Sequence, residues 1–219
     1  MSITKTTGLI LAVVNAYATA VNMTAITNAS EAVATLAAGH GVVVGDLLEM
    51  TSGWGRLDKR LVRAKTVATN DVTLEGVNTT STTAYPAGAG TGTVRRVNVA
   101  TGLTNLSQVK LISASGGDMG FEDVTAVDDV VSKQIPTIRS PVTMNLTVFD
   151  DPTLAWFTTL TAADDAGTPV GFRMAFPNGS KLIFNAYVSV ARVPIIESNS
   201  SLKTAIVLTF AADPIRYTT

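Results

Sequence analysis

Apolar and polar residues alternate most regularly in the last third of the chain. Over residues 141–150, one face of a predicted strand is apolar and the other carries threonines and an asparagine. Because successive side chains of a strand point to opposite faces, this pattern is typical of a half-buried strand. The alternation returns over residues 172–176 and 182–190, and the Pro-Asn-Gly sequence at 177–179 predicts a tight turn between them.

Two further elements complete this part of the chain. Residues 202–210 carry apolar side chains on both faces, which indicates a strand covered on both sides. A helix is expected at about residues 151–165, where apolar residues recur at helical spacing. Asp150-Asp151-Pro152 would supply its cap, a negative first turn and a proline at the first helical position, and Gly167 would end it. We expect this helix to pack on a sheet.

Residues 21–100 contain shorter apolar runs between strong turn signals. These signals include Gly39-His40-Gly41, Gly53-Trp54-Gly55 and a loop over residues 78–92 that is mostly Thr, Ala and Gly. Five or so short strands at this spacing suggest a small β-barrel.

Residues 113–140 fit neither the strand pattern nor the helix pattern. The stretch opens with Ser115-Gly116-Gly117 and carries five acidic residues before its first basic residue, Lys133. An irregular connection of more than about 15 residues in a compact domain is usually functional or disordered. This one is too apolar for a purely solvated linker. We expect it to become ordered against a partner subunit, the alternative being a mobile surface loop.

Composition supports a mostly β protein and excludes several kinds of function. Thr occurs 32 times and Val 26 times, and β-branched residues favour strands. The 16 basic and 17 acidic residues nearly cancel, so no overall field attracts nucleic acid or an anionic membrane. No window is long and apolar enough to span a bilayer. Without cysteine there is no disulfide framework, thiolate metal site or thiol nucleophile, and we expect no cofactor or metal.

No group of residues has the composition or spacing of a catalytic site. The single histidine, His40, lies between two glycines and is expected to be a turn residue. The adjacent pairs Asp128-Asp129, Asp150-Asp151 and Asp164-Asp165 would face opposite sides of a strand, so capping or solvation explains them better than a shared proton or metal. The glycines between positions 87 and 93 lack the strand and helix that flank a phosphate-binding loop. We therefore expect that the protein is not an enzyme.

A local cluster of basic residues follows Trp54 and contains one acid, Asp58. Its members are Arg56, Lys59, Arg60, Arg63 and Lys65. Nucleic-acid binding is one interpretation. With a single interleaved aromatic residue and no recognition helix, an exposed strand that faces solvent or an acidic neighbour is preferred. The acidic stretch between Asp118 and Asp129 is the candidate neighbour.

The N-terminal region imitates a secretory signal peptide. Lys5, the apolar run at 8–14 and the small residues at positions 16, 18 and 20 correspond to its three parts. The run is short, however, and strand-like periodicity continues to Ile26. We therefore prefer an N-terminal arm or first strand to a cleaved leader.

Three short motifs follow one another in the last third of the chain. They are LAWF at 154–157, FRMAFPNG at 172–179 and FNAYVS at 184–189, and the last strand comes after them. Their order and spacing resemble the major tail tube protein of long-tailed bacteriophages, and the acidic residues 121–132 correspond to the long inter-strand loop of that family. Residues 37–46 resemble a small β-barrel module that is added to the tube domain in phage tail proteins.

The resemblance implies a fold and a division into domains. The fold would be mostly β, a tail-tube-type β-sandwich or barrel with one α-helix and a long inter-strand loop, plus a small β-barrel domain. Residues 1–20 would form an N-terminal arm or strand that joins the tube domain, residues 21–100 an inserted barrel, and residues 101–219 the tube domain.

The resemblance also implies a structural virion protein. Rings of this chain, of six copies each, would stack into the tail tube through which the genome passes. The protein would be made in the host cytoplasm, contact itself and the tip, terminator and tape measure proteins, let DNA pass without sticking, and touch no membrane. Candidate contacts between subunits or rings are Asp118, Phe121, Glu122, Asp123, Val127, Asp128, Asp129 and Lys133. A net-negative channel wall would repel DNA phosphates, whereas a basic wall would trap them.

Two alternatives stay open. One is a secreted β-sandwich binding module, such as a surface adhesin, which the apolar run at 8–14 would favour. The other is a different structural role, at the tail tip or on the capsid. Retention of Ser2 in the mature protein would support a cytosolic virion component, and cleavage after Ala18 or Ala20 would support export.

Overall fold

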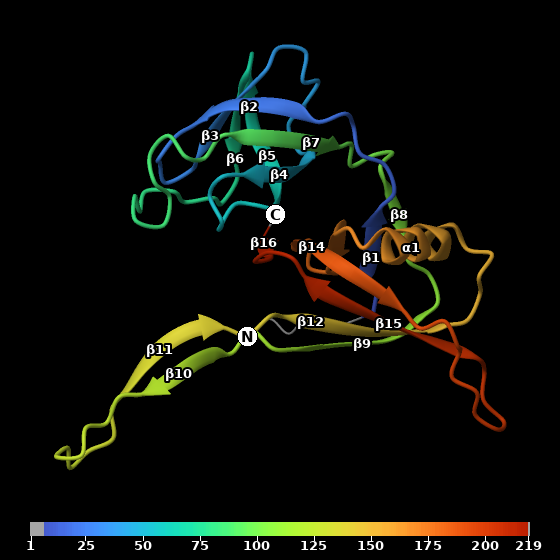
Figure 1. Ribbon diagram of the computed structural model, residues 1–219. Coiled ribbons are helices and arrows are strands. Elements are labelled where there is room, and N and C mark those ends of the chain that lie inside the picture. The colour runs from blue at the N-terminus through green and yellow to red at the C-terminus, as the bar shows by residue number, and fades with distance from the viewer. Residues whose placement is uncertain (1–6, 219) are drawn as a thin grey trace.

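Strands dominate the structure of the chain. The computed structural model describes residues 7–218, and within them there are sixteen strands and one helix (Figure 1). The strands form a closed six-stranded barrel, an eight-stranded sheet and a separate two-stranded ribbon. The prediction of a mostly β fold with one helix and a small barrel is therefore confirmed. In this part of the chain no helix has the length and apolar character that crossing a membrane would require.

The barrel is formed by strands between residues 21 and 97. In the order in which they pair, they are β2 (Val21–Ile26), β3 (Val33–Leu36), β6 (Asp71–Leu74), β5 (Leu61–Ala68), β4 (Leu47–Ser52) and β7 (Gly92–Val97). All neighbours are antiparallel, and β2 closes the barrel by pairing with β7. Trp54 is fully buried, packs edge-on against Tyr85 and donates its indole N–H to the carbonyl of Pro86 (2.7 Å). This contact fixes the loop over residues 78–92 on the barrel.

The eight-stranded sheet combines strands from both ends of the chain. Its order is β8 (Leu103–Asn105), β1 (Ile10–Val14), β13 (Val170–Ala175), β14 (Lys181–Val190), β15 (Lys203–Phe210), β12 (Thr143–Phe149) and β9 (Val109–Ser115), and β16 (Ile215–Tyr217) also pairs with β14. All pairs are antiparallel. The predicted turn at residues 177–179 connects β13 to β14, with Phe172 opposite Phe184.

Chain connectivity forces this sheet to curl. Its edge strands, β8 and β9, are six strand spacings apart, which would be about 29 Å in a flat sheet. Only residues 106–108 link β8 to β9, and the four residue steps from Asn105 to Val109 span at most about 14 Å. The sheet therefore bends into an incomplete barrel whose two edges approach each other at one end.

The inner face of the curled sheet forms a core of apolar side chains. Phe184 stacks between Phe172 and Phe210, with ring centroids 5.3 and 4.3 Å away. On β15, the expectation of two covered faces is wrong, because Val207 on the outer face is exposed while its neighbour Leu208 is buried. The outer face is covered by the small barrel at β13 and β14, and β15 lies beyond that contact.

The small barrel and the sheet meet through buried polar groups. Asn185 of β14 is buried and donates to the carboxylate of Glu49 (2.9 Å) and to the carbonyl of Lys59 (3.1 Å). The hydroxyl of Tyr217 in β16 accepts the backbone N–H of Arg63 (3.0 Å). Because a buried polar group is costly when it loses its partner, these bonds hold the two units in one orientation.

The helix begins later than the sequence predicts. α1 spans Ala155–Ala166 and has no side-chain cap and no acidic residue in its first turn. Asp151 instead accepts hydrogen bonds from the N–H and the hydroxyl of Thr153 (3.1 and 2.6 Å), so Asp151 and Pro152 form a turn before the helix. Gly167 ends the helix in the left-handed region (φ 60°), as predicted. α1 packs on β14, β1 and β8.

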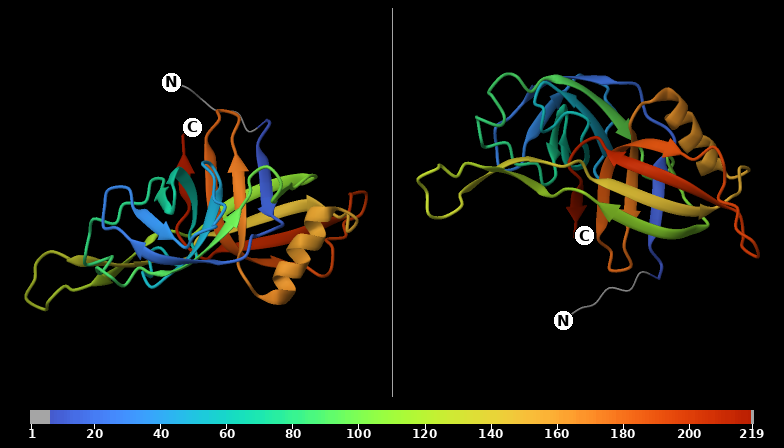
Figure 2. Two further views of the ribbon diagram at one scale, coloured as in Figure 1. Left: turned by 90° about the horizontal axis from the view of Figure 1, so that it is seen from above. Right: turned by 60° about the horizontal axis from the view of Figure 1, so that its bottom comes forward.

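Residues 113–140 are not a structureless loop. β10 (Met119–Asp123) and β11 (Gln134–Arg139) pair as an antiparallel ribbon that projects from the body of the molecule (Figures 1 and 2). Neither strand joins the sheet or the barrel, and every residue of β11 is exposed. Backbone pairing within the ribbon satisfies polar groups without any core, which the sequence pattern did not reveal. We call residues 116–140 the projecting hairpin.

Candidate functional site

The projecting hairpin leaves the sheet where β9 ends and β12 begins. At its root, Gly116 and Gly117 both have φ near 83°, a conformation that glycine adopts without strain. A Cβ on Gly116 would lie 2.1 Å from the carbonyl oxygen of Pro141, so the outgoing and returning chains pass in direct contact. Arg139 Nη1 donates to the carbonyl of Gly117 across the same root (3.1 Å). The Ser-Gly-Gly sequence thus sets the direction in which the hairpin departs.

Polar bonds within the hairpin fix the shape of its tip. Asp123 accepts the N–H and the hydroxyl of Thr125 (2.9 and 2.5 Å). Asp129 forms an ion pair with Lys133 and accepts the N–H of Ala126 (2.9 Å). The bonds from Thr125 lower the pKa of Asp123, and the bond from Lys133 is the main cause of the lowered pKa of Asp129. Three of the predicted contact residues therefore stabilise the hairpin itself.

The other predicted contact residues face solvent. The side chains of Asp118, Glu122 and Asp128 form no hydrogen bond or ion pair with any residue between 7 and 218. Phe121 is 61% exposed and Val127 is fully exposed. All eight predicted residues lie on this one hairpin, where free carboxylates stand beside exposed apolar side chains.

The apolar surface of the hairpin extends beyond the predicted residues. Its exposed large apolar side chains are Phe121, Val124, Val127, Val130, Val131, Ile135 and Ile138. Such a concentration of exposed apolar side chains on one segment is typical of an interaction site.

The predicted basic cluster is mostly bonded within its own subunit. The partners are Glu75 for Arg63 (2.5 Å), Glu31 for Lys65 (2.6 Å), the Tyr187 hydroxyl for Lys59 (2.9 Å) and the Asp213 carbonyl for Arg60 (3.4 Å). Arg56 is exposed. Within the subunit, the acidic neighbours of the cluster are therefore glutamates of the barrel and not the acidic stretch of the hairpin.

His40 and the pair Asp164-Asp165 have structural roles. His40 Nδ1 accepts the N–H of Val42 (3.0 Å), which leaves the proton on Nε2 to bond the carbonyl of Thr69 (2.8 Å). Asp164 and Asp165 both pair with Arg192 (3.1 and 2.6 Å). Among the described residues, no group of three or more histidine or acidic side chains could hold a metal ion.

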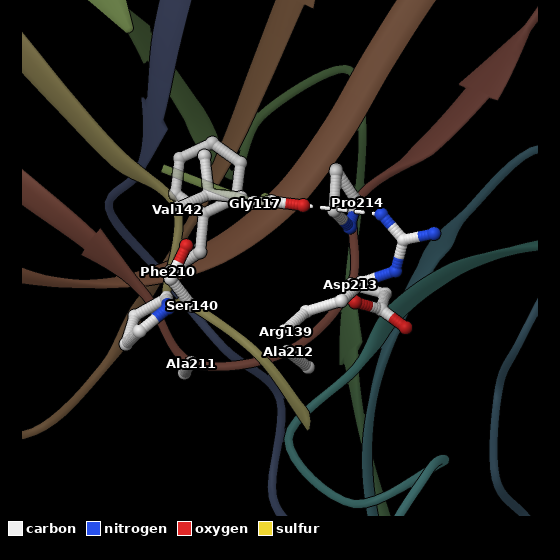
Figure 3. A pocket seen from close by; sticks show the side chains of 10 residues that line it. Gly117, Arg139, Ser140, Val142, Phe210, Ala211, Ala212, Asp213 and Pro214 are labelled. Atoms are coloured by element: carbon white, nitrogen blue, oxygen red, sulfur yellow. Dashed lines mark hydrogen bonds between the residues drawn. The ribbon is translucent and has the colours of Figure 1, made fainter. Parts of the chain in front are cut away.

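A groove of about 530 Å³ lies at the root of the hairpin (Figure 3). Arg139 and Ser140 of the hairpin form one side, and the residues that link β15 to β16 form the other. The hydroxyl of Ser140 is directed at the carbonyl of Asp118 (3.4 Å), and Figure 3 shows the guanidinium of Arg139 bonded to Gly117. Proline, alanine and valine make up much of the remaining lining, which suits contact with a protein surface better than catalysis.

Sequence reasoning missed an uncharged outer face formed by three rows of β9, β12 and β15; the next residue of β15 on this face, Lys203, is nearly buried and is bonded to Glu197. In paired rows the face carries Ser115, Thr143 and Thr209, then Ser113, Asn145 and Val207, then Leu111, Thr147 and Ala205. The alternation over residues 141–150 contained a signal, because the polar residues between its apolar ones, Thr143, Asn145 and Thr147, are uncharged. The extent of the face depends on strand order, which the alternation does not give.

A second missed surface lies on the link between β14 and β15, residues 191–202. Its exposed apolar side chains are Val193, Ile195, Ile196 and Leu202. The run Val-Pro-Ile-Ile at 193–196 was a visible signal, since an apolar run outside a strand or helix is unusual in a solvated turn.

Comparison with known proteins agrees with these features. The family model described as phage tail tube protein matches residues 52–219, from the end of β4 to the C-terminus. The matched part contains the projecting hairpin, α1 and every strand of the large sheet except β1. No curated protein matches the chain. Since the match covers well over half of the sequence, the chain belongs to the phage tail tube protein family.

Proposed function

We propose that rings of this subunit, with six copies in each, stack to form the tail tube through which the phage genome passes. Family membership supports a structural, non-enzymatic virion component that assembles with itself and with other tail components. The main structural support for stacked rings is the open sheet, which has two free edges and a long hairpin that projects from one end. Copies of the same chain would complete both features.

Ring closure would pair the free edges of neighbouring subunits. Among the described strands, β9 pairs only with β12 and β8 only with β1, so alternate backbone N–H and C=O groups of each face outward. Five of the seven residues of β9 are exposed. Such an edge is an aggregation hazard in a monomer, and a closed ring removes every edge at once.

The uncharged outer face of β9, β12 and β15 would line the channel. Over its three rows this wall carries no charged side chain, so there it neither traps DNA phosphates nor repels them and differs from both walls considered from the sequence. The small barrel lies on the far side of the molecule from β9 and β12 (Figure 1). We therefore propose that residues 21–100 are an inserted domain on the outside of the tube.

The projecting hairpin would join successive rings. Phe121 and Val127 would become buried against the next ring, and the free carboxylates of Asp118, Glu122 and Asp128 would face cations there. Asp123, Asp129 and Lys133 would contribute by holding the tip in shape.

Electron microscopy of tubes assembled from the purified subunit tests the proposal. We expect hollow, stacked rings with six-fold symmetry. A label attached to this chain should mark the tail tube of the virion. A label confined to the capsid or the tail tip would contradict the tube. Amides of residues 113–140 should exchange more slowly in the tube than in the free subunit, and equal protection would contradict the role of the hairpin.

The N-terminal strand favours a virion component over a secreted module. Lys5 and Ser2 lie outside the described residues, but β1 is buried between β8 and β13, with Val13 completely inaccessible. Cleavage after Ala18 or Ala20 would remove this core strand. N-terminal sequencing of the mature protein should therefore find β1 retained, as expected for a protein made in the host cytoplasm that contacts the tip, terminator and tape measure proteins.

A further inference from the structure

Two exposed apolar surfaces lie at opposite ends of the large sheet. The projecting hairpin comes just before β12 and lies at the end of the sheet where Thr143 starts that strand. The link at residues 191–202 leads into β15 at the other end, because Lys203 pairs with Phe149 and Thr209 pairs with Thr143. The three views in Figures 1 and 2 all place the hairpin and this link at opposite ends of the molecule.

The link is apolar although its side chains are not buried. Val193 and Ile196 are 74% and 75% exposed. Its backbone is nevertheless held in place, since Ile195 and Lys203 exchange hydrogen bonds (2.6 and 3.4 Å) and Lys203 pairs with Glu197 (2.6 Å). The link therefore presents a defined apolar surface to solvent.

We propose that the tip of the projecting hairpin docks on residues 191–202 of a copy in the next ring, an inference that rests on the proposed stacking of rings. Stacked rings repeat along one axis, so each contact joins one end of a subunit to the opposite end of another. The hairpin and the 191–202 link carry exposed apolar side chains at those two ends, so in a stack each would cover the other.

The hairpin is long enough for this contact. The eight residue steps from Met119 to Val127 would span about 26 Å in extended conformation. The seven residues of β12 span about 20 Å, so the hairpin reaches farther beyond the sheet than one strand of the sheet is long.

One basic residue near the link has no bonded partner and could meet an acidic residue of the hairpin. The hairpin carries five acidic and two basic residues, and Asp118, Glu122 and Asp128 are the acids without a bonded partner in residues 7–218. At the other end, Lys110 in β9 is exposed and forms no hydrogen bond or ion pair within that same range, although it is close enough to Glu197 to lower its pKa. Docking of the tip would bring Asp128 to Lys110.

Introduced cysteines test the contact without background, because the chain contains no cysteine. Tubes of the double variant Val127→Cys with Ile196→Cys, treated with a short bifunctional maleimide, should give a ladder of covalently linked subunits. Val130→Cys with Val193→Cys is the second test pair. Val127→Cys with Val43→Cys is the matched control, since Val43 is 55% exposed on the barrel and should give no ladder.

The outcomes separate this inference from the proposed function. Tubes in which neither test pair gives a ladder, or in which the control pair does, would overturn the docking and leave stacking intact. Absence of tubes from the parent protein would instead contradict the proposed function, and with it the docking. Asp128→Lys should reduce tube yield at least tenfold and Lys110→Asp in the same chain should restore it, so failure of that restoration would overturn the Asp128–Lys110 pairing.

Discussion

Replacing Val127 and Val130 by serine should weaken ring stacking without weakening the subunit. Their side chains are 108% and 100% exposed, so they make no apolar contact that the folded subunit would lose. The free energy of unfolding should change by less than about 0.5 kcal/mol. Burying a valine completely contributes about 1.5 kcal/mol. Loss of both should therefore cost about 3 kcal/mol per inter-ring contact, which is more than a hundredfold in the association constant.

Two measurements separate these effects. Tube length and yield in electron micrographs, taken over a series of subunit concentrations, give the critical concentration for assembly, which we expect to rise about a hundredfold. Thermal unfolding of the free subunit by circular dichroism gives its stability. The matched control is Val43→Ser with Val44→Ser, because these valines are also exposed but lie on the barrel.

Specific results would refute the reasoning. An unchanged critical concentration would mean that the hairpin valines stay in solvent in the tube. A lower melting temperature of the free subunit would mean that they already pack within it, contrary to their exposure. An equal effect of the control pair would place the contact on the barrel instead of the hairpin.

Three other changes test the subunit itself. Gly116→Ala should prevent tube formation while the barrel stays folded, because φ is 83° and the new Cβ would meet the carbonyl of Pro141 at 2.1 Å; normal tubes would contradict the described root. Asn185→Ala removes the bond to buried Glu49 and should cost about 2 kcal/mol in urea unfolding, whereas the exposed Asn145→Ala should cost almost nothing, and equal effects would contradict the junction. Burial raises the pKa of Tyr217 from 10.0 to about 12, so the fold favours the neutral phenol. Its contribution should be complete below pH 10 and lost as pH rises from 10 to 12. Because burial also raises the pKa of Tyr17, Tyr217→Phe should reduce this pH dependence of the unfolding free energy without abolishing it, and an unchanged dependence would contradict the burial of Tyr217.

Strands with one buried face were predictable, and the hairpin strands were not. The alternation over residues 141–150 reflects burial of one side of β12, which is a property of local sequence. In the projecting hairpin neither face is buried, so Phe121 and Glu122 follow no period that could mark a strand. Its pairing is set by the glycine root and by side-chain bonds at the tip. Asp151 misled the helix prediction because an aspartate before Pro-Thr can form a local turn as readily as a cap.

Residue types indicated the candidate contact segment, but they did not show which of its side chains lack a bonding partner within the subunit. Asp129 meets Lys133 whereas Asp128 has no such partner among the described residues, and only the folded hairpin separates the two. The partners of Lys65 and Arg63 lie 34 and 12 residues away, beyond local pattern. Strand order was likewise hidden, since β8 and β9 are consecutive in sequence and occupy opposite edges. The division at residues 20 and 100 stays a prediction.

The three-residue link between β8 and β9 bears on the bore of the tube. Leu106 is buried and donates its N–H to the carbonyl of Leu11 (2.7 Å), and Ser107 accepts the indole N–H of Trp156 (3.2 Å), so the link is fastened to both a strand and the helix. In the proposed ring, a subunit restrained in this way would have a fixed curvature before it assembles. The number of subunits in a ring would then be set by the curvature of the single chain. A ring with a wider bore would require extra residues at this link.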